Sequence, residues 1–205
     1  MDGQQSVRGT GRPRSQAAHQ AILDAAQELL ISEGYDGLRL EHVAAKAGVG
    51  KATLYRRWSS KAELAEALLE ELAIPAIALP DTDDTRTALL EVVMNTISAL
   101  TETPFGPVIR ALLSQIAINP KLGDPFRATV KQARRSQVAA VIERGIDRGD
   151  LHSTSHASTV AEILVGPIYY RLIFGGPLDR QFAEDIVSTF LDGHSDTATE
   201  EAQDT

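Results

Sequence analysis

The stretch Ala44–Lys61 constrains the fold more than any other part of this chain. Its sequence, AAKAGVGKATLYRRWSSK, predicts the end of one helix, a turn centred on Gly48 and a second short helix over residues 51–58. Small alanines before the turn let two helices cross closely, and glycine readily takes the left-handed conformation that ends a helix. The stretch therefore has the pattern of a helix-turn-helix.

The second helix of such a hairpin lies in the major groove of DNA. Leu54 and Trp58 are four residues apart on the predicted helix, which places them in a small core. Tyr55 has two interpretations, as a DNA-facing hydroxyl or as a further core aromatic. The side chains that offer hydrogen-bond donors to DNA are Lys51, Thr53, Tyr55, Arg56 and Arg57.

The net charge of −8 argues at first against DNA binding, but the charge is unevenly distributed. Residues 1–61 carry +3 and the remaining residues −11, so the N-terminal part is attracted to phosphate. Residues 1–15 are polar and lack apolar periodicity, which predicts a disordered basic arm. Arg12 and Arg14 of this arm either enter the minor groove or belong to a solubilising tail.

Apolar residues recur at helical spacing throughout the chain, and no alternation of period two is present. The pattern predicts an all-α protein of about nine helices. We expect a three-helix DNA-binding domain over residues 16–61, a helical ligand-binding and dimerisation domain over 62–192, and a disordered tail over 193–205. Prolines and acidic residues at 75–84 indicate a loop after the fourth helix.

Two predicted helices near the C-terminus, at residues 156–174 and 179–191, carry apolar residues on more than one face. Such helices are either central in a core or bury a second face against another molecule. Two copies related by a two-fold axis would form a homodimer through these helices. This dimer would place two recognition helices about 34 Å apart, one turn of DNA.

Several other classes of function find little support in the sequence. The chain has no cysteine and no apolar run of 18 residues, so we expect no disulfide and no membrane span, and a cytoplasmic location. His152 and His156 have a metal-binding spacing but lie in a Ser/Thr-rich turn, so we predict neither a metal ion nor a cofactor. An all-helical enzyme and an architectural DNA-binding protein without a ligand remain as alternatives.

Residues 34–38 (GYDGL) and 43–61 (VAAKAGVGKATLYRRWSSK) resemble the DNA-binding region of the TetR family of bacterial transcription regulators, over about residues 17–64. The resemblance implies a homodimeric repressor that leaves a palindromic operator when a small molecule binds. It implies that Lys61 contacts phosphate. Arg39 stands where the family commonly has a threonine that caps the helix and binds phosphate, so we expect the cap to be lost and the Arg39 guanidinium to bind phosphate instead. The residues that it implies for reading DNA are Lys51, Ala52, Thr53, Tyr55 and Arg56.

The effector pocket of such a regulator is expected among the helices of residues 85–174, because helical bundles hold ligand sites in their cores. The apolar side chains predict a largely apolar ligand, although each such side chain is more often plain core than pocket lining. We expect ligand binding to shift the fourth helix and so the distance between the recognition helices. The candidate pocket residues are Met94, Phe105, Ile109, Leu113, Phe126, Val130, Tyr169 and Phe174.

Overall fold

The structure is a computed structural model that describes residues 12–73, 78–152 and 156–193, with only the backbone described for residues 12–14. Every regular element in these ranges is helical, so the prediction of an all-α chain with about nine helices is confirmed. The chain divides into two compact units between Leu68 and Leu69. This division falls seven residues beyond the boundary expected after residue 61.

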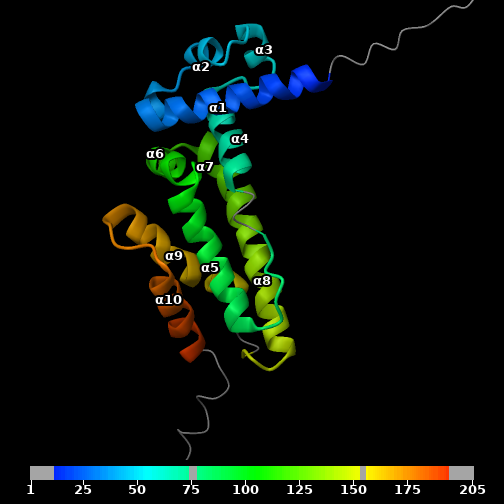
Figure 1. Ribbon diagram of the computed structural model, residues 1–205, viewed down its shortest axis with the longest axis vertical. Helices are drawn as coiled ribbons and strands as arrows, with labels where there is room; N and C mark the ends of the chain where they lie inside the picture. Colours follow the sequence, from blue (N-terminus) through cyan, green and yellow to red (C-terminus); the bar gives the residue numbers. More distant parts are fainter. Residues whose placement is uncertain (1–11, 74–77, 153–155, 194–205) are drawn as a thin grey trace, which may run out of the picture. The chain divides into compact units, whose positions relative to one another are not determined.

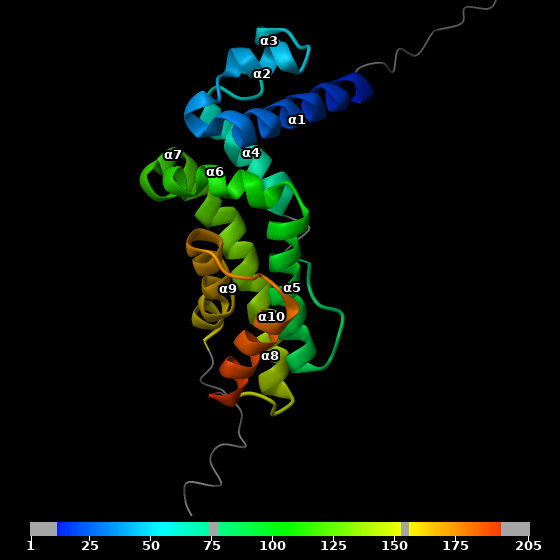
Figure 2. The ribbon, with the colours of Figure 1, turned by 60° about the vertical axis from the view of Figure 1, so that its left-hand side comes forward.

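The first unit contains α1 (Arg12–Gly37), α2 (Leu40–Lys46), α3 (Lys51–Tyr55) and most of α4 (Lys61–Ala73). Figures 1 and 2 show α2 and α3 on the same side of α1. The core is built from leucine, isoleucine and alanine of α1 together with side chains of the other helices. Its fully buried members include Ile22, Ala26, Leu30, Val43, Leu54 and Leu64.

Helix α1 begins earlier than the sequence indicated. Residues 12–15 are helical, so the prediction that they belong to a disordered arm is wrong, and residues 1–11 of that arm lie outside the described residues. Helix α1 is kinked at Gly34, near its C-terminal end, where the φ of 71° is not helical. The side chains of Arg12 and Arg14 are likewise outside the described part, so their minor-groove role stays a prediction.

The second unit is a bundle of longer helices. Helix α5 packs against α6, α8 and α10, and α9 lies beside α8 and α10 (Figure 1). Asp84 caps α5 by accepting a hydrogen bond from the amide of Thr87 at 2.7 Å, and Asp179 caps α10 in the same way from Phe182. The elements are α5 (Thr85–Glu102), α6 (Phe105–Ile118), α7 (Pro120–Phe126), η2 (Arg127–Lys131), α8 (Gln132–Asp147), α9 (Ala157–Phe174) and α10 (Arg180–Asp192).

Helices α7 and α8 are joined by the π-helical turn η2 without a break in the chain. Asn119 caps α7 by accepting a hydrogen bond from the amide of Lys121, and Pro120 occupies the first helical position. Pro125 lies inside α7, just before η2, where its missing N–H removes one α-helical hydrogen bond. Turns of the π type often occur at functional sites, and η2 borders the cavity described below.

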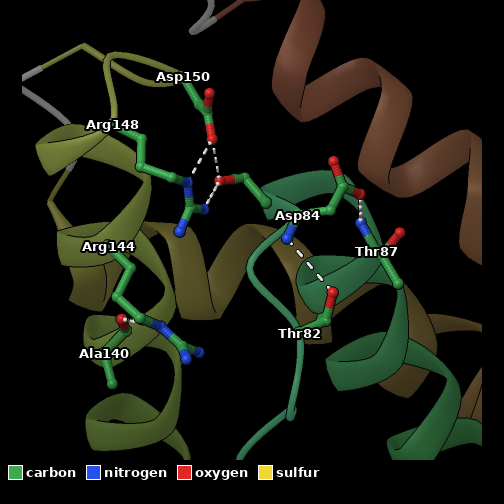
Figure 3. Close-up of polar contacts among 8 residues, drawn as sticks. Thr82, Asp84, Thr87, Ala140, Arg144, Arg148 and Asp150 are labelled. Carbon is green, nitrogen blue, oxygen red and sulfur yellow. Dashed lines mark hydrogen bonds and ion pairs between the residues drawn. The ribbon is translucent and has the colours of Figure 1, made fainter.

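A polar cluster ties the start of α5 to the turn after α8 (Figure 3). Thr85, which is 4% exposed, donates to a carboxylate oxygen of Asp150 at 2.7 Å. Arg148 donates to the same Asp150 oxygen at 3.0 Å and to the Thr85 hydroxyl at 2.6 Å. The hydrogen bonds from Thr85 and Arg148 lower the pKa of Asp150. The cluster fixes two segments of the bundle that are far apart in the sequence.

Candidate DNA-binding surface and ligand cavity

The turn between α2 and α3 is fixed by backbone hydrogen bonds around Gly48. The amide of Gly48 donates to the carbonyl of Ala45 at 3.2 Å, and the amide of Val49 donates to that of Ala44 at 3.0 Å. This pair of bonds is a Schellman motif, and it requires the left-handed φ of 65° that Gly48 has. The turn therefore sets the direction in which α3 leaves α2.

Helix α3 has a buried side and an exposed side. Leu54 is fully buried and Trp58 is 7% exposed, so their prediction as core residues is confirmed. Regular helix ends at Tyr55, three residues before the predicted end, and Arg56 and Arg57 lie in a turn. Thr53 is half-buried. The predicted DNA-reading side chains that are exposed are Lys51, Ala52, Tyr55 and Arg56.

Tyr55 is 43% exposed, which rules out the alternative that it is a core aromatic. Its hydroxyl donates to a carboxylate oxygen of Glu41 at 2.6 Å, so the ring is held against α2. This hydrogen bond lowers the pKa of Glu41 and raises the pKa of Tyr55. Glu41 was not among the predicted residues, because a tyrosine–glutamate pair 14 residues apart leaves no local pattern in the sequence.

The cationic side chains that lie before and after α3 in the chain differ in their surroundings. Arg39 is exposed at the N-cap of α2 and makes no side-chain capping bond, so the expected loss of the cap is confirmed. Lys61 donates to the carbonyl of Tyr35 at 2.9 Å and lies 4.2 Å from the centre of that ring. Arg57 donates to the carbonyl oxygen of Ser15 at 2.8 Å, which anchors the start of α1. Arg57 is thus a structural residue in this unit.

The second unit contains a cavity of about 380 Å³. Its walls come from the last residue of α4 and from α5, α6, α7, η2, α8 and α9. Much of the lining is apolar, as expected for a ligand pocket. The apolar lining residues are Ala73, Phe105, Ile116, Phe126, Val130, Ala161 and Val165.

Only part of the predicted pocket set borders this cavity. Phe105, Phe126, Val130 and Tyr169 line it. Ile109 is fully buried in the core of the unit, and Phe174 is 73% exposed beside Tyr170, so neither belongs to the cavity. Met94 and Leu113 are half-buried but also lie outside the lining. Helical periodicity identified the inward faces of these helices, but not which inward side chains border a void.

The sequence interpretation missed the charged residues of the cavity. Lys131 forms an ion pair with Glu162 at 3.0 Å across η2 and α9. Arg134 donates to the side-chain oxygen of Gln137 at 2.7 Å, and burial lowers the pKa of Arg134 to about 10. A clue was present, since Arg134 lies four residues from both Val130 and Val138 on the apolar face. The charged lining residues are Arg127, Lys131, Arg134, Arg135 and Glu162.

Helix α9 carries an exposed apolar face. Ile163, Tyr170, Ile173 and Phe174 are between 39% and 73% exposed. By contrast, the apolar residues of α10 point to one side and its exposed residues are polar, so the prediction of apolar residues on several faces is wrong for α10. Within the described residues α9 is also the one helix long and apolar enough to cross a membrane by length and composition.

The described residues contain no group of three or more histidine, cysteine, aspartate or glutamate side chains that could hold a metal ion. His152 is half-buried and His156 is the N-cap residue of α9.

Two family models match the chain. Residues 22–68 match the model described as "Bacterial regulatory proteins, tetR family", and residues 79–190 match "Tetracyclin repressor-like, C-terminal domain". The first match covers the helix-turn-helix and the second covers the bundle that holds the cavity.

Similar proteins cover nearly the whole chain. The HTH-type transcriptional regulator YdeS of Bacillus subtilis is 31% identical over 94% of this chain and 97% of its own length. The DNA-binding transcriptional repressor TetR of Mycobacteroides abscessus is 31% identical over 87% of this chain and 94% of its own. The crystal structure of the TetR family transcription regulator SCO0332 is 30% identical, covers 86% of this chain and 97% of its own, and has a TM-score of 0.69. The chain therefore belongs to the TetR family of DNA-binding transcriptional regulators, and it is not an enzyme.

Proposed function

We propose that this regulator is a cytoplasmic homodimeric repressor that binds a palindromic operator and leaves it when a small molecule occupies the cavity. The observation that carries the proposal is the exposed side of α3, which offers cationic and hydroxyl groups while Leu54 and Trp58 anchor the opposite side. The relative from Mycobacteroides abscessus, which is named a repressor, supports repression as the direction of control.

In this proposal the exposed side chains divide into base-reading and phosphate-binding groups. Lys51 and Arg56 can donate to guanine, and the methyl groups of Ala52 and Thr53 can contact thymine. Tyr55 contacts phosphate through its hydroxyl, which requires that the bond to Glu41 be shared or broken. The remaining phosphate contacts are assigned to Arg39, Lys61, Arg12 and Arg14.

Footprinting on the DNA that flanks the protein's own gene tests the operator assignment. We expect protection of two half-sites related by a two-fold axis, with centres one helical turn of about 34 Å apart. Binding to random DNA with no preferred site would instead favour an architectural protein without sequence specificity. Repression is tested separately, with a reporter placed behind the protected site.

The homodimer is assigned to the exposed face of α9, with α10 beside it. Tyr170 and Phe174 lie 4.9 Å apart, centre to centre, and are 64% and 73% exposed. Large apolar patches on a soluble domain mark interaction sites, and a two-fold axis lets the same patch cover itself. Self-association also accounts for the apolar composition of α9 without a membrane.

The double variant Tyr170→Ser/Phe174→Ser should be monomeric at micromolar concentration in sedimentation velocity, whereas the wild type should be dimeric. Ile118 is 74% exposed at the end of α6, a different helix, so Ile118→Ser is a matched control and should remain dimeric. A wild-type protein that sediments as a monomer would contradict the proposal.

Ligand release is assigned to the C-terminal end of α4. Ala73, the last residue of α4, lines the cavity. Gln137 accepts a hydrogen bond from Arg134, which lines the cavity, and donates one to the carbonyl of Ala78 just beyond α4. A ligand that displaces Ala73 would therefore act directly on the end of α4, and one that displaces Arg134 would act on Ala78 through Gln137.

A thermal-shift screen of small molecules, read together with operator release, tests this assignment. Gln137→Leu removes the hydrogen bond to Ala78 and should leave ligand binding measurable while weakening operator release. If ligands of the wild-type cavity bind without any loss of operator affinity, ligand control is wrong and operator binding stands.

A further inference from the structure

The charges around the cavity do not balance. Its lining includes the cations Arg127, Lys131, Arg134 and Arg135 but one acid, Glu162, which is already paired with Lys131. Arg127 is paired with Asp124 and also donates to the carbonyl of Ile116 at 3.1 Å. Arg134 is therefore the cation at the cavity wall whose position most needs an explanation.

The Arg134 guanidinium is held on the apolar side of α8 with a neutral partner. Within the described residues its one hydrogen bond is to the amide oxygen of Gln137, which leaves most of its five N–H groups available. Even with its pKa lowered to about 10 by burial, the side chain is charged at neutral pH. Removing a charge from water costs several kcal/mol, and a carboxylate partner is the usual compensation.

A second polar group reaches the same cavity from α9. Tyr169 lines the cavity, and its hydroxyl makes no hydrogen bond to any other described residue. Burial raises the pKa of Tyr169, opposed by the nearby Arg134, so the phenol is a neutral O–H donor at neutral pH. A guanidinium from α8 and a phenol from α9 together offer several N–H donors and one O–H donor to a ligand, and the phenolic oxygen is the one acceptor of the pair.

Another part of the wall is suited to an apolar body. Phe105, Phe126, Val130 and Val165 line the cavity beside the two donors. Its volume of about 380 Å³ is at the small end of the usual range for ligand pockets. A compact ring system or a medium-length acyl chain matches this size.

We propose that the effector is a small amphipathic carboxylate, whose carboxylate pairs with Arg134 and accepts a hydrogen bond from Tyr169 while its apolar body lies against Phe105 and Phe126. Guanidinium and carboxylate groups form paired hydrogen bonds with matching geometry. This inference rests on the proposal that the cavity is the effector site, and it adds a carboxylate to the largely apolar ligand expected from the sequence.

Isothermal titration of the full chain with matched probes tests the inference. Two pairs are used, naphthalene-2-acetate with naphthalene-2-acetamide and decanoate with decanamide, because the members of each pair differ mainly in charge. We expect the acid of at least one pair to bind at least about tenfold more tightly than its amide, which corresponds to about 1.4 kcal/mol.

Variants test whether the preference for the acid depends on Arg134 itself or on positive charge in general. Arg134→Met retains much of the side-chain volume and should bring the acid-to-amide ratio close to one, and Tyr169→Phe should lower it several-fold. Arg134→Lys keeps the charge but loses the planar fork, so it should retain part of the preference. Arg110 is exposed on α6 outside the lining, so Arg110→Met should leave the ratio unchanged. Circular dichroism checks that each variant is folded.

Equal binding of acid and amide, an unchanged ratio in Arg134→Met, or no saturable binding by any of the four probes would overturn the inference. Operator binding by the ligand-free wild type is measured on the same preparation. Operator binding without acid binding would defeat this inference alone, whereas a protein that binds no operator would defeat the proposed repressor function. Acid binding without operator release would confirm the anion site and contradict ligand control.

Discussion

Arginine is placed in opposite ways in the two units of this molecule. Arg56 is exposed at the end of a five-residue helix, within one continuous stretch of sequence. Arg134 is half-buried in a cavity whose walls come from helices spread over residues 73–169. On an exposed surface a charge keeps its hydration, and salt screens its attraction to phosphate. In a cavity the same charge interacts more strongly and at a fixed distance. The exposed arrangement suits association with a long polyanion, and the arrangement in the cavity suits selection of one small anion.

The largest effect is expected from core truncation, which tests whether the two units can be damaged independently. Leu54 in the first unit and Leu89 in the second are both fully buried leucines. Leu54→Ala and Leu89→Ala should each lower the free energy of unfolding of their own unit by about 2–5 kcal/mol. Urea denaturation should show two transitions, with Leu54→Ala moving the first unit's transition and operator affinity, and Leu89→Ala moving the other. A single transition shifted equally by both variants would show that the units unfold together.

Arg56→Ala is expected to weaken operator binding without changing stability. If Arg56 reads a base, the variant should lose about 1–3 kcal/mol of binding free energy on the operator and little on random DNA. If it binds phosphate, both DNAs should be affected and the slope of affinity against salt should fall by about one. Binding is measured by fluorescence anisotropy at several salt concentrations, with Arg110→Ala as an exposed control. Unchanged affinity would remove Arg56 from the DNA-binding set.

The hairpin could be predicted from sequence because its determinants are local. Gly48, Leu54 and Trp58 act over a few residues, through one turn and one helix face. Two hydrogen bonds could not be predicted from sequence, because they join residues that only the tertiary fold brings together. They are the bond from Tyr55 to Glu41 and the bond from Lys61 to the Tyr35 carbonyl. These contacts hold side chains that the sequence assigned to DNA alone.

The cavity was predictable only in outline. Apolar periodicity placed it in the bundle, but Ile109 and Phe105 have the same pattern, and whether a side chain meets another or a void depends on three or more helices at once. Charged residues mostly lie in solvent, so the sequence offers little reason to place Arg134 in the cavity. Its position between Val130 and Val138 on the apolar face was the one local sign of burial.

A smaller effect on stability is expected from Gly48→Ala, which tests the turn that aims α3. No heavy atom lies within 4 Å of a Cβ added at Gly48, so the cost arises from its φ of 65° alone. Left-handed backbone costs an L-residue about 1–2 kcal/mol. Gly50 has an ordinary φ of −67° and equally open surroundings, so Gly50→Ala is the matched control and should be nearly neutral in thermal denaturation. Equal destabilisation by both variants would show that the cost does not arise from the left-handed φ of Gly48.

The smallest effect is expected from Asp150, whose cluster with Thr85 and Arg148 belongs to the second unit alone. Its pKa is lower in the folded than in the unfolded protein, so its stabilising contribution is present above the unfolded aspartate pKa of about 3.9 and is lost as the pH falls through the folded value. Because the Asp150 side chain is 44% exposed, solvent screens the gain. Urea midpoints of the wild type and Asp150→Asn should differ at pH 7 and converge as the pH falls below the unfolded aspartate pKa, with exposed Asp83→Asn as the control. A difference that does not change with pH would mean that Asp150 acts through packing or neutral hydrogen bonding. The first unit's transition should be the same in both proteins at every pH, since the cluster makes no bond to that unit.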